Sequence, residues 1–421
     1  MKTKWKQGKL STLCHRIGDG LHGTPNYTTG TDYFFINGNN LENGKIVITS
    51  ETKTVAEAEY KKHFIDLNEN TLLLGINGTI GNMAFYSEEQ IMLGKSAAYL
   101  NFKTNINRFY YYYFQLNGVQ KYFYDVATGS TIKNLSLKSI QDFIVPIPDE
   151  SEYKEIVATL AIIDKKIELN NKISAALEQM ARTLYDYWFV QFDFPDRNGK
   201  PYKSSGGAMV YNEALKREIP KDWEVKELDQ IISKSGTGLN PRDNFELGHG
   251  DNFYITIKNV KGGKIIFNDT CDRVDDEALK IINKRSDLQI GDILFTSIEP
   301  VGVTYFIHEK PTDWNINESV FTIRANYGKV TAEYLYMLLS GSEMKSFTKN
   351  ASAGSIHKGI RHNVLKTFRL PYKDKILTEE FSKLVSPILK RIYILDNESQ
   401  KLADLRDWLL PMLMNGQVTV K

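Results

Sequence analysis

The sequence predicts an α+β protein in which two tandem, β-rich α/β units are separated by two long helices. Three observations predict this class: an internal duplication through the whole chain, heptad-spaced apolar residues after each copy, and short apolar segments broken by Gly, Asn and Pro within each copy. Because the two helices match each other, we expect them to pair as an antiparallel coiled coil. That pairing would give the chain a pseudo-twofold symmetry.

The duplication starts near the N-terminus. Apolar residues and glycines recur 218 positions later, Trp5, Leu10, Gly18 and Gly20 as Trp223, Leu228, Gly236 and Gly238. A second set recurs 225 positions later, Gly129, Lys133, Phe143 and Pro146 as Gly354, Lys358, Phe368 and Pro371. We therefore expect five segments: a globular unit over 1–150, a central helix over 151–190, a linker over 191–222, a second globular unit over 223–375 and a C-terminal helix over 376–416.

Each long helix is predicted by apolar residues at the a and d positions of a heptad. Residues 152–189 contain neither proline nor glycine, and 379–414 align with them at the offset of 225. The predicted seam consists of Leu160, Ile163, Ile167, Leu177 and Leu184 in the first helix and Ile388, Ile392, Leu395, Leu402 and Leu409 in the second. Asn170, Ser174 and Arg406 also occupy a or d positions and weaken this seam. The alternative is that each helix simply supports its own unit.

Within the units, short segments rich in apolar and aromatic residues predict strands. They lie at 33–37, 45–49, 71–76 and 83–86 in the first unit and at 253–258, 264–267, 292–297 and 303–307 in the second. One helix per unit is expected, at 106–116 and 331–339. Residues 109–114, FYYYYF, could stack on bases, but the second copy reads YLYML at 334–338, and replacement of some aromatic residues by aliphatic ones favours core packing. We expect a mixed or antiparallel sheet.

The composition is that of an ordinary globular protein. Net charge is +2, which argues against a non-specific polyanion binder. Cys14 and Cys271 are far apart, which favours a reducing compartment. The first residues and the lack of a long apolar run predict neither a signal peptide nor a membrane span. The expected location is the cytoplasm, with no membrane partner.

Motifs that carry chemistry are missing. Residues 18–23 match GxGxxG, but Thr24-Pro25 follows, which predicts a turn and not the helix of a dinucleotide site. The seven histidines have no metal-ligand spacing, and there is no P-loop, no GxSxG and no motif for methyl transfer to a base amino group. We therefore expect no catalytic residue, no metal and no cofactor in this chain.

Two pairs of glycine-led loops keep their frame between the copies while their polar side chains differ. Such side chains reach phosphates and base edges, which makes these loops candidate DNA-binding segments. The candidate residues are His22, Thr24, Asn26, Tyr27, Ser130, Thr131, Lys133 and Asn134 in the first copy and Asn240, Arg242, Asn244, Ser355, His357, Lys358 and Arg361 in the second. The alternative is that they are solvated surface loops.

The passage between the copies carries a specific resemblance. Residues 184–189, LYDYWF, run into the FDFP of 192–195, and GKPYKSSGG at 199–207 and IPKDW at 219–223 follow. With the duplication and the two helices, this passage resembles the specificity (S) subunits of type I restriction–modification systems, the HsdS family. The C-terminal copy departs from the pattern, because it stops near Gly416 without a second FDFP.

The resemblance implies a function. Each unit would be a target recognition domain for one half of a bipartite double-stranded DNA sequence, and the helices would be spacers that dock two methyltransferase (M) subunits. Restriction (R) subunits would join that complex, and S-adenosylmethionine, ATP and Mg would belong to the partner subunits. The competing hypotheses are a coiled-coil scaffold that joins two partner proteins without touching DNA, and a stand-alone DNA methyltransferase or nuclease.

Overall fold

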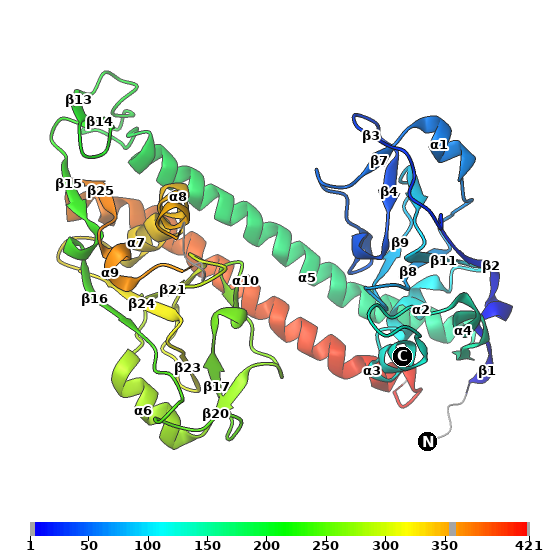
Figure 1. The fold of residues 1–421 in the computed structure, drawn as a ribbon. Helices are drawn as coiled ribbons and strands as arrows, with labels where there is room; N and C mark the ends of the chain where they lie inside the picture. Colours follow the sequence, from blue (N-terminus) through cyan, green and yellow to red (C-terminus); the bar gives the residue numbers. More distant parts are fainter. Residues whose placement is uncertain (1–4, 353–358, 419–421) are drawn as a thin grey trace. The chain divides into compact units, whose positions relative to one another are not determined.

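The structure, a computed structural model, describes residues 5–352 and 359–418 (Figure 1). It divides into two units, unit 1 with Met1–Glu168 and Gln400–Lys421, and unit 2 with Leu169–Ser399. Each unit holds one globular domain and one end of each long helix, α5 (Glu150–Tyr185) and α10 (Lys375–Met414). We call the globular parts domain 1, which precedes α5, and domain 2, which precedes α10.

Domain 1 is built on an antiparallel sheet. Its strand order is β2 (Cys14–Asp19), β11 (Ala97–Phe102), β8 (Thr71–Gly75), β9 (Met83–Phe85). All residues of β8 and β11 are buried, because both faces of the sheet are covered. A second, mixed sheet has the order β10 (Ile91–Leu93), β4 (Phe34–Ile36), β7 (Thr54–Val55), β3 (Tyr27–Thr28), with β10 and β4 parallel.

Short elements complete domain 1. They are β1 (Lys6–Lys9) paired with β12 (Ile144–Ile147), η1 (Leu10–Leu13), η2 (Gly38–Asn40), the hairpin β5 (Leu41–Glu42) and β6 (Lys45–Ile46), α1 (Glu57–Lys62), α2 (Asn107–Tyr113), α3 (Asn117–Val126) and α4 (Leu137–Asp142). On α2, Phe109, Tyr110 and Tyr112 are buried, which confirms core packing for the FYYYYF run. The expectation of one helix in this unit was wrong. The aromatic-rich sequence of α3 has low intrinsic helix propensity and therefore does not predict a helix. Burial of Val119 and Phe123 stabilises α3 in the folded domain.

Domain 2 repeats the plan of domain 1. Its antiparallel sheet has the equivalent order β16 (Ile232–Thr237), β24 (Val320–Ala325), β21 (Ile293–Thr296), β22 (Thr304–Phe306). The second sheet has the order β20 (Asp272–Val274), β17 (Asn252–Ile255), β23 (Trp314–Ile316), again with a parallel pair, β17 and β23. β15 (Glu224–Glu227) pairs with β25 (Arg369–Tyr372), as β1 pairs with β12. The internal duplication is therefore present in the fold.

One expectation for the second half was wrong. Among its described residues, domain 2 has four α-helices where one was expected: α6 (Asp276–Ser286), α7 (Ala332–Leu339), α8 (Ser342–Ala351) and α9 (His362–Lys366). It also contains the 3-10 turns η4 (Leu228–Gln230) and η5 (Ile257–Asn259) and the hairpin β18 (Val260–Lys261) and β19 (Lys264–Ile265). The π-helical turn η3 (Asp186–Val190) leads into the predicted linker, which contains the hairpin β13 (Met209–Asn212) and β14 (Arg217–Pro220). Phe192 and Phe194 of the linker pack on Trp223. Aromatic burial fixes this segment despite its glycines and prolines.

The long helices run antiparallel within each unit. In unit 2, the Asn170 amide donates to Glu398 at 2.8 Å, while the Tyr185 ring near the end of α5 contacts the Phe381 ring near the start of α10. In unit 1, Arg406 of α10 pairs with Asp164 of α5 at 3.0 Å. The predicted seam residues face inward: Leu160, Ile163, Ile388, Ile392 and Leu395 are buried, and Ile167, Leu177, Leu184, Leu402 and Leu409 are half-buried. The polar a and d residues form hydrogen bonds across the pair.

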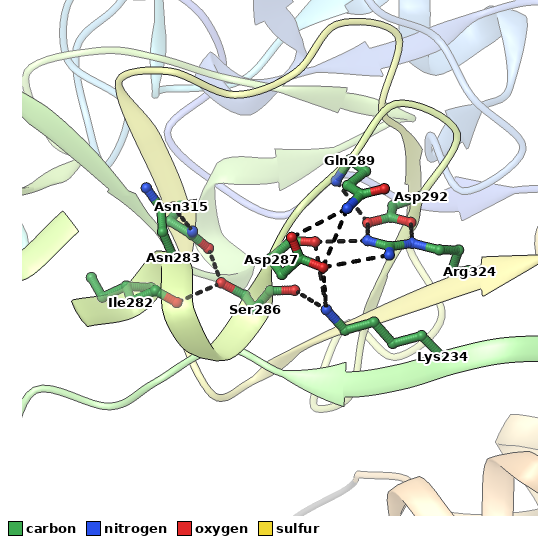
Figure 2. A network of polar contacts seen from close by, with 9 residues as sticks. All are labelled: Lys234, Ile282, Asn283, Ser286, Asp287, Gln289, Asp292, Asn315 and Arg324. Carbon is green, nitrogen blue, oxygen red and sulfur yellow. Dashed lines mark hydrogen bonds and ion pairs between the residues drawn. The ribbon is translucent and has the colours of Figure 1, made fainter. Parts of the chain in front are cut away.

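A polar network ties the strands of domain 2 to the segment that precedes β21 (Figure 2). The Arg324 guanidinium makes two hydrogen bonds to the fully buried Asp292 carboxylate, at 2.7 and 2.9 Å, and a third to the Asp287 carbonyl at 2.7 Å. Lys234 of β16 donates to the Ser286 carbonyl at 2.8 Å and to the Asp287 carboxylate at 3.1 Å. The hydrogen bond from Lys234 holds the pKa of Asp287 below its ordinary value.

Domain 1 has a neutral version of this network at the equivalent positions. Asn101 stands where domain 2 has Arg324, and its amide donates to the Asp66 carbonyl at 2.8 Å. Thr71 stands in place of Asp292 and donates its hydroxyl to Asn101 at 2.8 Å. The strands are thus connected to the preceding segment by neutral groups in domain 1 and by charged groups in domain 2. These contacts fix one end of each central sheet, opposite to the loops that form the candidate site described below.

Candidate nucleic-acid interface

Four loops of domain 1 gather at one end of its central sheet. Antiparallel neighbours place the ends of β2 and β8 beside the starts of β11 and β9. Hydrogen bonds join the loops: the Leu21 amide donates to Leu93 at 2.8 Å, Ile76 to Ser96 at 2.9 Å, and Leu135 to Ile76 at 2.8 Å. We call residues 20–26, 76–82, 94–96 and 128–134 loop cluster 1.

The predicted residues of the first copy lie in or directly beside loop cluster 1. His22, Thr24, Asn26, Tyr27, Ser130 and Thr131 are exposed, and Lys133 and Asn134 are half-buried. His22 pairs with Asp19 at 2.7 Å, and Lys133 donates to the Tyr124 carbonyl at 3.1 Å with its ammonium 4.0 Å from the Tyr124 ring. A Cβ at position 20 would stand 1.9 Å from the Leu93 carbonyl oxygen, so the close approach of the two loops requires glycine there.

Domain 2 has an equivalent group of loops. The Ser297 amide donates to Ser319 at 2.9 Å and the Ile360 amide to Ser297 at 2.8 Å, while a Cβ at Gly238 would stand 2.0 Å from the Ile316 carbonyl oxygen. We call residues 238–244, 297–303, 317–319 and 359–361 loop cluster 2. Cluster 2 therefore occupies the same end of the sheet as cluster 1 does in its own unit.

The predicted residues of the second copy divide into two groups. Arg242, Asn244 and Arg361 are exposed in loop cluster 2, and Asn240 is half-buried; the Asn244 amide donates to the Asn240 carbonyl at 3.0 Å. Ser355, His357 and Lys358 lie outside the described residues. Arg242 has a φ of 23°, so this turn holds an arginine in a backbone conformation that non-glycine residues rarely adopt.

Sequence reasoning missed several polar residues of these clusters. Lys95 is exposed between β10 and β11 in cluster 1, and Asn77 donates to Asn134 at 3.4 Å. In domain 2, Arg285 of α6 reaches the Gly238 carbonyl at 3.3 Å and the Thr237 hydroxyl at 3.4 Å. The duplication could have identified Asn77, because the loops that follow β8 and β21 occupy equivalent places in the two copies. Each cluster thus combines amides, hydroxyls and basic groups, which can donate to phosphates and base edges.

The described residues lack the features of a metal site, a reactive cysteine or a membrane span. The described residues contain no group of three or more His, Cys, Asp and Glu side chains that could hold a metal ion. Burial raises the pKa of the Cys14 thiol to about 12, so this cysteine is protonated at neutral pH and unsuited to nucleophilic attack. Within the same described ranges, no helix is both long enough and apolar enough to cross a membrane.

Known proteins are similar to this chain in sequence and in fold. A family model described as "Type I restriction modification DNA specificity domain" matches residues 2–179 and 220–376, which is well over half of the chain. The MjaIX specificity subunit of a type I restriction enzyme from Methanocaldococcus jannaschii is 24% identical over 325 residues, which cover 75% of this chain and 70% of the relative. The EcoBI specificity subunit from Escherichia coli is 22% identical over 380 residues, 86% of this chain and 77% of the relative.

A solved structure shares the fold along nearly the full length. The crystal structure of a type I restriction–modification system S subunit from M. genitalium superposes with a TM-score of 0.60. The alignment covers 98% of this chain and 96% of that one, at 17% sequence identity. The tandem arrangement of two similar domains and two long helices is therefore an architecture already seen in a solved protein.

Proposed function

This chain belongs to the type I restriction–modification DNA specificity family, and from that premise we propose that each globular domain recognises one half of a bipartite DNA target. The chain is the sequence-specific DNA-recognition subunit of such a system and is not itself an enzyme. The scaffold alternative is not favoured, because the relatives are specificity subunits. The catalytic alternatives are disfavoured for the same reason.

The observation that carries the proposal is the pair of loop clusters. Both use the same backbone frame at the same end of equivalent sheets, while the exposed side chains differ: His22, Thr24 and Asn26 in one, Arg242 and Asn244 in the other. Amides and hydroxyls recognise base edges, and basic groups also position the protein on phosphates. Two copies with different side chains therefore recognise two different short sequences.

The helix pair is proposed as the spacer between the two domains. A double-stranded target presents the same face about once per helical turn, so two domains held by a stiff spacer recognise half-sites at a fixed separation. Paired helices with a buried apolar seam supply such stiffness better than a flexible linker does. The near-neutral charge of the chain fits a complex in which partner subunits contribute phosphate contacts.

Two methyltransferase (M) subunits are proposed to dock on the helices, and restriction (R) subunits to join through them. The support is a repeated set of exposed apolar residues at the offset of 225: Leu169 matches Ile394, and Met180 matches Leu405. Exposed apolar side chains at equivalent places on two helices suit two copies of one partner. S-adenosylmethionine, ATP and Mg would be bound by those partners, and the complex would act in the cytoplasm, where it meets DNA.

Substitution of one cluster should affect one half-site. We expect Arg242→Ala to weaken binding to the cognate duplex about 5- to 100-fold, because one lost base or phosphate contact costs roughly 1–3 kcal/mol. In titrations of the complex with methyltransferase subunits, the variant should no longer distinguish a correct second half-site from a scrambled one. Its discrimination at the first half-site should persist, and Lys133→Ala should give the converse result.

Arg197→Ala is the matched control, since Arg197 is exposed but lies in the segment between the domains, outside both clusters. It should leave both half-sites recognised. Equal loss of discrimination at both half-sites in Arg242→Ala would contradict separate recognition by the two domains.

A further inference from the structure

Each domain carries a short hairpin with the same construction. The turn residues Asn43 and Gly44 have φ values of 48° and 79°, and Gly262 and Gly263 have 52° and 75°. Positive φ at both central residues is the geometry of a tight two-residue hairpin turn. A tyrosine supports each turn: a Cβ at Gly44 would stand 3.2 Å from the Tyr111 hydroxyl, and one at Gly263 would stand 3.6 Å from that of Tyr336. Tyr111 and Tyr336 are equivalent at the offset of 225.

A lysine follows each turn and reaches a long helix. The Lys45 ammonium lies 2.6 Å from the Glu168 carboxylate on α5, and the Lys264 ammonium lies 2.7 Å from the Asp396 carboxylate on α10. The two lysines are equivalent in the duplication, but the carboxylates are not, because the position equivalent to Glu168 is Tyr393. The contact between hairpin and helix is thus kept while the acidic residue has moved by about one helical turn.

Carboxylates on the helices also join each domain to both helices. In unit 1, Asp164 of α5 accepts from the Tyr112 hydroxyl of domain 1 at 2.6 Å and from Arg406 of α10 at 3.0 Å. In unit 2, Asp396 of α10 accepts from Lys264 of domain 2 and from the Ser174 hydroxyl of α5 at 3.2 Å. A single acidic side chain therefore fixes three elements in each unit.

A ring contact also joins domain 2 to α10, about one helical turn before Asp396. His308 of domain 2 stacks on the Tyr393 ring of α10 with the ring centroids 4.5 Å apart. Burial lowers the pKa of His308 to about 4, so this side chain is neutral at pH 7 and adds no positive charge there. The Asp396 side chain is 16% exposed and the Lys264 side chain 36% exposed, so this pair is less solvated than that of Lys45 and Glu168.

From these contacts we propose that Lys45 and Lys264 are positioning residues that fix the tilt of each domain on the helix pair and so set how strictly the half-site separation is recognised. This inference rests on the proposed function. Domain 1 joins α5 covalently near Glu150, and its lysine holds a residue about 27 Å farther along the helix. Domain 2 joins α10 near Lys375 and is held about 32 Å along it. Two attachment points so far apart oppose rotation of a domain about its connection.

The test is a charge reversal in domain 2, Lys264→Glu, in the complex with methyltransferase subunits. Methylation rates are compared on the cognate duplex and on duplexes with one base pair added or removed between the half-sites. Because repulsion from Asp396 frees the hairpin, the rate on altered spacings relative to the cognate should rise about two- to fivefold. Adding Asp396→Lys to this variant should restore the wild-type preference.

Lys258→Glu is the matched control, because Lys258 is exposed in η5, directly before the same hairpin, and is not the cross-strand neighbour of Lys264. It should retain the wild-type spacing preference. An unchanged preference in Lys264→Glu, or an equal relaxation in Lys258→Glu, would overturn the positioning role while leaving bipartite recognition intact. A wild-type complex that recognises no bipartite target would overturn both.

Discussion

Replacement of Arg324 by methionine should destabilise domain 2 by about 3–5 kcal/mol, because it leaves the buried Asp292 carboxylate without its cationic partner. Asp292 is fully buried, and beyond the guanidinium it accepts from the Gln289 amide at 2.9 Å. The loss should appear as earlier urea unfolding and as faster hydrogen exchange of the β21 and β24 amides. Amides of β8 and β11 in domain 1 should keep their protection.

The matched variant transplants the neutral pair of domain 1. Asp292→Thr with Arg324→Asn reproduces Thr71 and Asn101, which make the same contacts without charge. This double variant should cost less than Arg324→Met alone, since replacing both members of a buried pair avoids an unpaired charge. If Arg324→Met left exchange in β21 and β24 unchanged, the network would not hold the sheet.

Lengthening both helices by one heptad should lengthen the DNA spacing. The insertions belong at facing positions, after Glu168 in α5 and after Ser399 in α10, as the Asn170–Glu398 hydrogen bond indicates. Seven residues add about 10 Å of helix, or up to about three base pairs. Sequencing of the methylated sites should show the same two half-sites with a longer unspecified gap.

An insertion in one helix alone serves as the control. It breaks the register of the seam, and we expect methylation of both the original and the lengthened target to fall at least about tenfold, because the two domains are no longer held in place. An unchanged gap after the double insertion would contradict the spacer role of the helices.

The sequence predicted the fold best where an apolar or glycine pattern recurs along the chain. Heptad positions such as Ile163 and Ile388 predicted helices that the structure contains, because an apolar seam produces a regular spacing of apolar residues within a short stretch of sequence. The duplication predicted two similar domains, since equivalent glycines such as Gly20 and Gly238 are required by the same close backbone approach in each copy.

Other features depended on contacts between distant residues. The hairpin at 209–220 lay in a segment of linker composition, and its order comes from aromatic packing around Trp223. Lys45 looked like a surface lysine, because its partner Glu168 lies 123 residues away. In the candidate site, the loop frames were predictable from their repetition. The contact of Lys133 with the carbonyl and ring of Tyr124 was not predictable, since it depends on how α3 packs beside the loop.

α6 was missed although its ends carry recognisable signals. Asp275 caps the first turn by accepting from the Ala278 amide at 2.8 Å, and Lys284 and Arg285 occupy the last turn. This helix brings Arg285 to loop cluster 2. Because the helix was not predicted, Arg285 was not among the predicted site residues.

Bipartite recognition by this chain can be tested by methylome sequencing of cells that carry the partner methyltransferase, with and without this chain. We expect a modified motif with two short specified halves separated by an unspecified gap of constant length, and its complete loss when the chain is deleted. A continuous motif, a gap that varies from site to site, or methylation that persists without the chain would contradict it.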